Sequence, residues 1–116
     1  MKKIFYLETC KTCQKILKEL EPLDGIELRE IKFKGITTIE LEELRALTNS
    51  YEELFSRRAM LFRQRNLKDQ TLTEEDYKNL ILEHYTFLKR PVVVVKKQIF
   101  IGNSRKQVDA AKEALH

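Results

Sequence analysis

Hydrophobic and polar positions change their period along the chain, and these changes mark the predicted elements. The first apolar run, at residues 2–7, shows little alternation and predicts a buried strand. Over residues 12–20 the apolar positions recur every three or four residues, which predicts a helix that Thr9 caps and Pro22 ends. Residues 26–31 then alternate with period two and predict a second strand. The opening third of the chain therefore predicts a β-α-β unit with parallel strands.

The middle of the chain, at about residues 36–88, shows only helical spacing and predicts a helical insert. Thr37 or Thr38 precedes its first helix, and Thr73 followed by Asp76 is a capping signature for a later one. Shorter helical segments or turns are predicted between these two helices. The predicted apolar positions of the two helices are Leu41, Leu44, Ala46, Leu47, Tyr77, Leu80 and Ile81.

The C-terminal part returns to strand patterns before it ends in a helix. Four consecutive valines at residues 92–95 predict a buried strand. Residues 96–98 predict a hairpin turn, residues 99–101 a returning strand, and Asn103 or Ser104 the start of a last helix. The order β-α-β, helical insert, β-β-α predicts an α/β protein with a four-stranded mixed sheet in the thioredoxin-like arrangement. We expect one domain over residues 1–116.

The composition narrows the function classes. The chain has 116 residues, of which 34% are charged and 42% hydrophobic, with only 3 Gly and 2 Pro, which is typical of a folded, helix-rich domain. The net charge of +4 is mild and favours anionic substrates or partners rather than direct nucleic-acid binding. No run approaches the roughly 20 apolar residues of a membrane span, and no secretion signal begins the chain. We therefore expect a cytoplasmic protein without a membrane partner, whose thiols are kept reduced.

Both cysteines lie where the first strand gives way to the first helix. A thiol just before a helix meets unpaired N–H groups and the positive end of the helix dipole, which favour its thiolate form. We predict that Cys10 is the nucleophile, that Cys13 resolves a mixed disulfide, and that Lys11 adds positive charge. Inert buried cysteines are one alternative. A zinc site is another, although only His84 and His116 remain as further ligands unless two copies share the metal. We expect no metal and no bound cofactor.

Arg58 and Arg90 are the candidate anion-binding side chains. Arg90 precedes Pro91 at the head of a predicted strand, where thioredoxin-like folds place a cis proline beside the active thiol. In such a fold Arg90 would project near Cys10 and hold an oxyanion through two hydrogen bonds. Arg57 competes with Arg58 for the inward position, and the alternative for both Arg58 and Arg90 is a solvated surface site.

Taken together, several stretches make the chain resemble the glutaredoxin-linked arsenate reductases (ArsC) and the related Spx regulators over nearly its full length. The stretches that carry the resemblance are Tyr6–Cys13, Ser56–Phe62, Leu88–Val94 and Ile101–Gly102. The resemblance implies a thioredoxin-like fold with a helical insert. It also implies that Cys10 is the nucleophile, that Arg58 and Arg90 are the anion-binding arginines and that Pro91 is the cis proline. We add Pro91 and Thr12 as substrate-binding candidates.

The chain also departs from both branches of the resemblance. Arsenate reductases of this type use a third arginine after the final strand, where this chain has Asn103, with Arg105 nearby. The presence of Cys13 instead resembles the Spx regulators. In those proteins the cysteine pair is an oxidation switch, and the protein binds the C-terminal domain of the RNA polymerase α subunit. Those regulators carry a glycine in the insert that residues 47–51 lack.

Two main hypotheses follow for the function. The first is an enzyme, a thiol oxidoreductase that reduces arsenate or a disulfide, with glutathione and the glutaredoxin or thioredoxin system as electron donors. The second is a redox-sensing regulator that binds the RNA polymerase α subunit. A thioredoxin-like protein with neither activity is the third reading.

Overall fold

The computed structural model describes residues 2–116 and places the chain in two compact units. The first, the sheet unit, consists of residues up to Lys34 together with Arg90–His116, and the second, the helical unit, is Gly35–Lys89. The sheet unit contains β1 (Lys2–Tyr6), α1 (Lys11–Glu19), β2 (Glu27–Glu30), β3 (Val92–Val95), β4 (Gln98–Ile101) and α5 (Arg105–Leu115). The helical unit contains α2 (Thr38–Ala46), α3 (Met60–Gln64) and α4 (Glu74–Glu83), with 3₁₀ turns at Glu52–Leu54, Leu67–Asp69 and Tyr85–Phe87. The single domain expected from the sequence stays a prediction.

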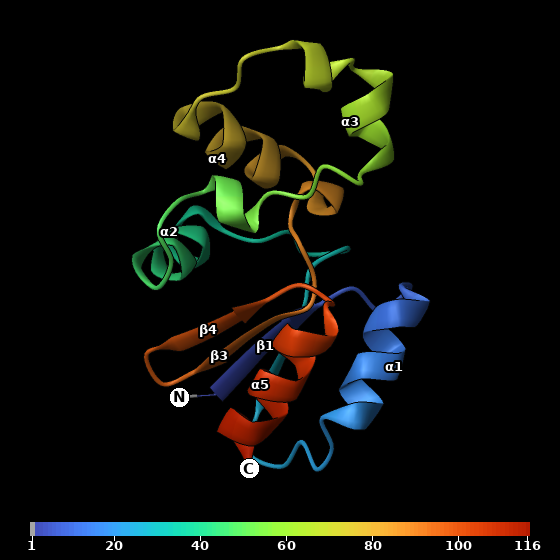
Figure 1. The fold of residues 1–116 in the computed structure, drawn as a ribbon, viewed down its shortest axis with the longest axis vertical. Coiled ribbons are helices and arrows are strands. Elements are labelled where there is room, and N and C mark those ends of the chain that lie inside the picture. Colours follow the sequence, from blue (N-terminus) through green and yellow to red (C-terminus); the bar gives the residue numbers. More distant parts are fainter. Residues whose placement is uncertain (1) are drawn as a thin grey trace. The chain divides into compact units, whose positions relative to one another are not determined.

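The sheet has four strands in the order β2-β1-β3-β4 (Figure 1). β1 and β2 are parallel, and Tyr6 lies beside Glu30. The two strands can be parallel because α1, which connects them, returns the chain to the end of the sheet at which β1 begins. β3 is antiparallel to both β1 and β4, and Phe5 lies beside Val92. The mixed α/β fold predicted from the sequence is therefore confirmed.

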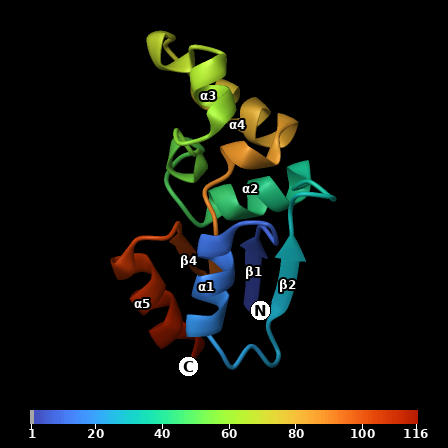
Figure 2. The ribbon, with the colours of Figure 1, turned by 90° about the vertical axis from the view of Figure 1, so that its right-hand side faces the viewer.

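The core of the sheet unit lies between one face of the sheet and two helices. α1 and α5 lie side by side over this face (Figures 1 and 2). The buried side chains of this core come from both helices and from the two central strands: Ile4, Ile16, Leu20, Val93, Val95, Val108, Ala111 and Leu115. This packing fixes α1 against β1, and with it the turn between them that carries Cys10.

The helical unit is held together by aromatic packing and by capped helices. The Phe55 ring, which is fully buried, stacks on Phe87 at 5.3 Å and lies 4.9 Å from the ring of Tyr77. A short bridge pairs Phe55 with Leu88, so the end of the first 3₁₀ turn and the end of the unit are joined by backbone hydrogen bonds. Tyr77 is buried as its helical spacing predicts, whereas Ala46, at the end of α2, is exposed.

Two further local predictions are wrong. Thr9 does not cap the first helix, because the chain turns tightly enough for the Cys10 N–H to reach the Leu7 carbonyl, which makes Cys10 the capping residue. Gln98 belongs to β4 rather than to the hairpin turn. The turn needs only two residues, since Lys96 takes a left-handed φ of 56°, the geometry that suits the twist of a tight hairpin.

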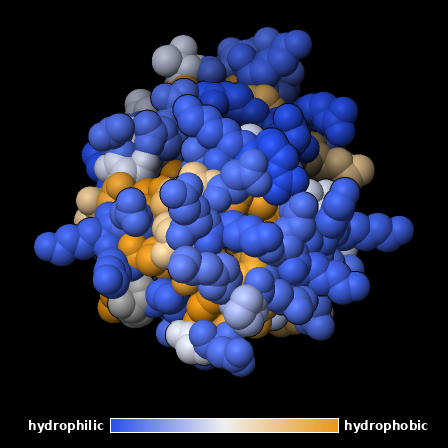
Figure 3. Space-filling view, turned by 60° about the horizontal axis from the view of Figure 1, so that its bottom comes forward, coloured by the Kyte–Doolittle hydropathy of each residue, from blue (hydrophilic) through white to orange (hydrophobic). Residues whose placement is uncertain are grey.

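Some large apolar side chains are exposed at the surface. On the face drawn in Figure 3, hydrophilic residues in blue surround areas of hydrophobic surface in orange. Large apolar side chains that are exposed include Leu28 and Phe33 in the sheet unit and Ile39 and Met60 in the helical unit. Over residues 2–116, none of the helices combines the length and the hydropathy that a membrane crossing requires.

Candidate functional site

Cys10 occupies the N-cap position of α1, directly beyond the carboxyl end of β1. Its backbone is extended, with φ −88° and ψ 115°, and its carbonyl accepts the first helical hydrogen bond from the Gln14 N–H at 3.0 Å. The Cys10 side chain makes no capping hydrogen bond of the usual kind. The first N–H groups of α1 have no partner within the helix, so they are available to a negative charge at the N-cap.

The surroundings of Cys10 favour its thiolate. Partial burial acts to raise its pKa, but hydrogen bonds from the Cys13 N–H and side chain, the positive charge of Arg90 and the Thr12 N–H outweigh burial. The pKa of Cys10 is therefore lower than that of an ordinary cysteine. Its side chain is half-buried, so a reactant can reach the sulfur.

Cys13 has the opposite character. Its side chain is 0% exposed, and burial raises the pKa of its thiol to about 11, assisted by the charge of Cys10 and the hydrogen bond between the two side chains. Hydrogen bonding to the Leu7 backbone and the charge of Arg90 act the other way. Both cysteines are free thiols in the structure. The pair therefore consists of an accessible thiol with a lowered pKa and a buried thiol with a raised pKa in contact with it.

The turn before Cys10 is held by residues that the sequence reading missed. One oxygen of the Glu30 carboxylate accepts the Glu8 N–H at 3.0 Å, and the other accepts the Lys32 N–H at 2.7 Å and the Phe33 N–H at 3.2 Å. The Gln14 side chain donates to the Glu8 carbonyl at 2.5 Å. Strand register could have found Glu30, because parallel pairing places it beside Tyr6, where β1 ends.

Glu30 is ionised in this arrangement. Partial burial acts to raise its pKa, but the hydrogen bonds from Glu8, Phe33 and Lys32 hold the pKa below its usual range. Three backbone donors around one carboxylate join the loop before α1 to the loop after β2. Glu30 therefore positions the turn that presents Cys10.

Arg90, Pro91 and Thr12 all lie in the sheet unit with Cys10. The Arg90–Pro91 peptide bond is cis, as the resemblance implies, and the Pro91 side chain is fully buried beside the start of β3. Arg90 acts on both cysteine thiols through its charge. Thr12 contributes its backbone N–H to Cys10, while its side chain is exposed. Roles for these residues in substrate binding stay predictions.

Arg58 belongs to the helical unit, where it is exposed just before α3. Its neighbour Arg57 is engaged with that unit, because its guanidinium bonds the Glu52 carboxylate at 2.7 Å and the Tyr77 hydroxyl at 2.9 Å. Arg57 is therefore occupied by structural contacts, which leaves Arg58 as the candidate for an anion. That Arg58 faces Cys10 stays a prediction.

The region after β4 does not supply a third arginine to the thiol. Arg105, in the first turn of α5, pairs with both oxygens of Glu19 at 3.1 and 3.3 Å and with Asp109 at 3.1 Å. Its guanidinium is thus tied to the end of α1 and to its own helix. Asn103 is exposed in the turn before the Ser104 cap.

Each histidine makes contacts within its own unit. His84 accepts the Thr86 N–H at 3.2 Å and stacks on Tyr85, and His116 is hydrogen-bonded to the Leu20 carbonyl at 2.7 Å. Among residues 2–116, no three His, Cys, Asp or Glu side chains are grouped as a metal ion would require. Their contacts give both histidines structural roles.

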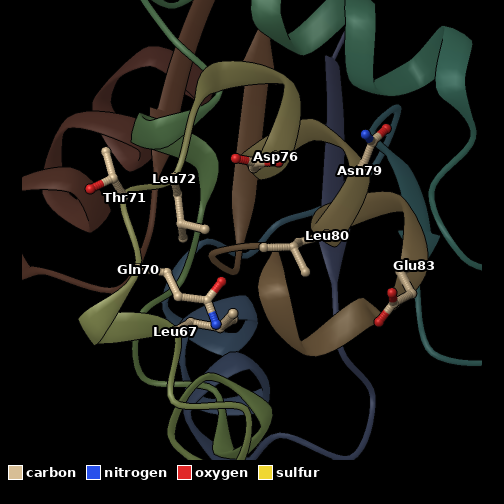
Figure 4. Close-up of a pocket in the computed structure, with 8 residues that line it drawn as sticks. All are labelled: Leu67, Gln70, Thr71, Leu72, Asp76, Asn79, Leu80 and Glu83. Carbon is tan, nitrogen blue, oxygen red and sulfur yellow. The ribbon is translucent and has the colours of Figure 1, made fainter.

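A pocket of about 220 Å³ lies within the helical unit (Figure 4). Leu67, Leu72 and Leu80 surround it together with polar residues, none of which is a predicted site residue. Of its charged lining residues, Asp76 completes the cap of α4 and Glu83 pairs with Arg65. The pocket therefore offers no ionisable group beyond those that already serve the fold.

Comparison with known proteins places this geometry in a family. The chain is 28% identical to the global transcriptional regulator Spx 2 of Bacillus cereus over 108 residues, which cover 90% of this chain and 82% of that protein. It is 25% identical to the global transcriptional regulator Spx of Streptococcus pneumoniae over 110 residues, or 92% of this chain and 82% of that protein.

Solved structures share the fold. An ArsC family related protein from Bacteroides fragilis superimposes with a TM-score of 0.79 at 24% identity, covering 95% of this chain and 96% of that one. An arsenate reductase from Vibrio cholerae does so with a TM-score of 0.73 at 24% identity and the same coverage. At this identity the likeness concerns the fold alone. The ArsC family model matches residues 5–111, and the chain therefore belongs to the ArsC family.

Proposed function

We propose that this protein is a thiol oxidoreductase in which Cys10 attacks the substrate and Cys13 resolves the intermediate. The observation that carries the proposal is the contrast between the two thiols. Cys10 is reachable and has a lowered pKa, whereas Cys13 is buried against it with a pKa raised to about 11. A nucleophile must be ionised and accessible, and a resolving thiol must wait protonated until the intermediate forms.

The reaction with a disulfide balances without any further cofactor. The Cys10 thiolate attacks one substrate sulfur, a bond forms between the two sulfurs, and the other substrate sulfur leaves as a thiolate. Cys13 then loses its proton and attacks Cys10. That ionisation becomes easier at this stage, because the charge and hydrogen bond of the Cys10 thiolate, which both raise the pKa of Cys13, are lost in the mixed disulfide. The products are the second substrate thiolate and a Cys10–Cys13 disulfide, which an external dithiol or glutathione reduces.

Arsenate is the alternative substrate of the same thiol. Cys10 would displace hydroxide from arsenic, and attack of a second thiol on the Cys10 sulfur would leave the electron pair on arsenic and release arsenite. Arg90 would hold an arsenate oxygen, with Arg58 as its predicted partner. Because Arg105 is committed to Glu19 and Asp109, the site has fewer cations for arsenate than the resemblance implies, and a disulfide is the better supported substrate.

The test is turnover with glutathione and glutaredoxin, with arsenate or a low-molecular-weight disulfide as substrate. Wild-type protein should reduce at least one of them, and Cys10→Ser should be inactive. Cys13→Ser, incubated with the disulfide in the absence of glutathione and glutaredoxin, should hold the Cys10 mixed disulfide. The rate of alkylation with iodoacetamide should rise with pH and level off below the range of an ordinary cysteine, because the pKa of Cys10 is lowered. Absence of turnover with both substrates would overturn the proposal.

A redox-sensing regulator is the second candidate, favoured by the curated relatives, which are named as global transcriptional regulators. In this reading a Cys10–Cys13 disulfide changes a surface that binds the C-terminal domain of the RNA polymerase α subunit. The test is capture of that purified domain by reduced and by oxidised protein. Capture that depends on the redox state, without catalytic turnover, would favour the regulator.

A further inference from the structure

We propose that Lys11, Lys15 and Lys18 on α1 form a docking stripe for an acidic partner protein whose disulfide reacts with Cys10. This inference rests on the proposed thiol exchange and adds to it the charge of the partner and the surface that it meets. At 3.6 residues per turn, the three lysines fall within an arc of about 60° on α1, opposite the buried side chains of Cys13 and Leu20. The stripe begins at the residue after Cys10 and extends along the helix by about 10 Å.

The three lysines are free to meet a partner. All are exposed, and none makes an ion pair or a side-chain hydrogen bond with another residue in the described part of the chain. The acidic residue on α1, Glu19, is occupied by Arg105. The stripe therefore presents unpaired lysines on α1, the helix on the near side of the sheet unit in Figure 2.

Helix stability does not account for the stripe. The first turn of α1 contains no acidic residue, and Lys11 places a cation at the positive end of the helix dipole, which is unfavourable. Lys11 and Lys15 are also spaced four residues apart, where like charges repel. Only Lys18, in the last turn, suits the dipole. The repulsion among these lysines does not stabilise the fold, so we attribute the positive charge to the binding of a partner.

An acidic protein fits this surface better than a small anion does. A small anion would be held close to the sulfur, whereas Lys15 and Lys18 lie one and two turns away from it. Charges spread over that length act on a surface that approaches Cys10 along α1, and they speed association with an oppositely charged partner.

The experiment uses two synthetic peptides with one cysteine each, activated as a mixed disulfide with 2-thiopyridine. One peptide carries four glutamates after the cysteine, and the other carries four glutamines. Cys10 attacks the peptide sulfur, a disulfide to the peptide forms, and released pyridine-2-thione reports the rate. At low salt the acidic peptide should react about tenfold faster with the wild-type protein, and high salt should remove the difference.

The decisive variant is Lys15→Gln/Lys18→Gln, which leaves Lys11 in place beside Cys10. It should lose most of the preference for the acidic peptide while keeping the wild-type rate with neutral iodoacetamide. The control, Lys97→Gln/Lys112→Gln, removes the same net charge from residues outside α1, in the turn between β3 and β4 and in α5. The control should keep the full preference.

The outcomes separate this inference from the function on which it rests. If wild-type Cys10 reacts with neither peptide, the proposed thiol exchange fails. If it reacts with both at equal rates, or if the control loses the preference as much as the decisive variant does, the docking stripe is wrong while thiol exchange stands. Two competitors of the acidic-peptide reaction are then compared: duplex DNA and the glutamate peptide in its reduced, unactivated form. If DNA inhibits the reaction at a lower concentration than the reduced peptide does, the stripe binds nucleic acid and the proposal is overturned.

Discussion

The first turns of α1 and α4 use the same backbone groups for different purposes. α4 begins with a capping box, in which Thr73 and Asp76 satisfy each other's N–H groups, and its first turn carries three acidic residues. α1 begins with Cys10, whose sulfur accepts the Cys13 and Thr12 N–H groups in place of a capping hydroxyl or carboxylate, and no acid follows in its first turn. Unpaired N–H groups favour any negative charge placed before them. In α4 that charge comes from carboxylates and stabilises the helix, whereas in α1 the negative charge at the N-terminus is the Cys10 thiolate.

The largest effect should follow from Cys10→Ser, which turns the reactive cap into an ordinary one. Reactivity toward iodoacetamide and disulfides should vanish, while the free energy of unfolding should rise by up to about 1 kcal/mol, because serine is a preferred N-cap. Urea unfolding measures the stability, and alkylation measures the reactivity. Cys10→Ala, which removes the thiol without supplying a cap, should lose the reactivity but should not gain stability. Equal stability of the serine and alanine variants would show that α1 does not need a cap.

The next effect concerns the loop before α1, which lacks a capping box and depends on Glu30 instead. Glu30→Gln should lower the free energy of unfolding by about 1–2 kcal/mol at neutral pH, because three backbone donors lose a charged acceptor. Urea unfolding measures the loss. Glu27→Gln, which removes an exposed carboxylate from the same strand, is the control and should change stability far less.

The pH dependence of the Glu30 variant has a definite sign. The pKa of Glu30 is lowered on folding, so its contribution is present above the unfolded pKa of a glutamate and is lost as the pH falls through the folded value. The difference in stability between wild type and Glu30→Gln should therefore shrink on acidification from neutral pH. A difference that stays constant would contradict the role given to the charge.

A smaller effect is expected at the capped helix. Thr73→Ala should lower the free energy of unfolding by about 1 kcal/mol, because the Asp76 N–H loses its acceptor. Thr71→Ala, at a nearby exposed position outside the cap, should change it by less than about 0.5 kcal/mol. Cys10 alkylation should stay at the wild-type rate in both, and a slower rate would mean that the cap of α4 also serves the thiol.

The smallest effect should come from giving α1 the kind of acid that α4 has. Lys11→Glu should raise the free energy of unfolding by roughly 0.5 kcal/mol through the helix dipole. It should also raise the pKa of Cys10, because a negative charge beside the thiol opposes the thiolate, so alkylation at neutral pH should slow. Lys11→Gln is the neutral control. Faster alkylation of the glutamate variant would contradict this account of the α1 first turn.

The sequence by itself determined the elements of the fold and the residue types of the candidate site. Alternation, helical spacing and capping signals are local properties, so the β-α-β start, the capped helices of the insert and the valine strand were all predictable. Cys10 and Cys13 stand at a strand-to-helix junction that is visible in the sequence. The Arg90–Pro91 bond could be anticipated only through the resemblance.

Tertiary structure decided which side chains are free to act and which are engaged elsewhere. Arg105 pairs with Glu19 across 86 residues of sequence, and Arg57 pairs with Tyr77 across 20. No local pattern shows such contacts. The place of Glu30 beside the Cys10 turn follows from strand pairing, and the contrast between the two thiols follows from burial. The sequence therefore specified the residues of the site, and long-range packing set their charge states, because burial and hydrogen bonding arise only when distant segments meet.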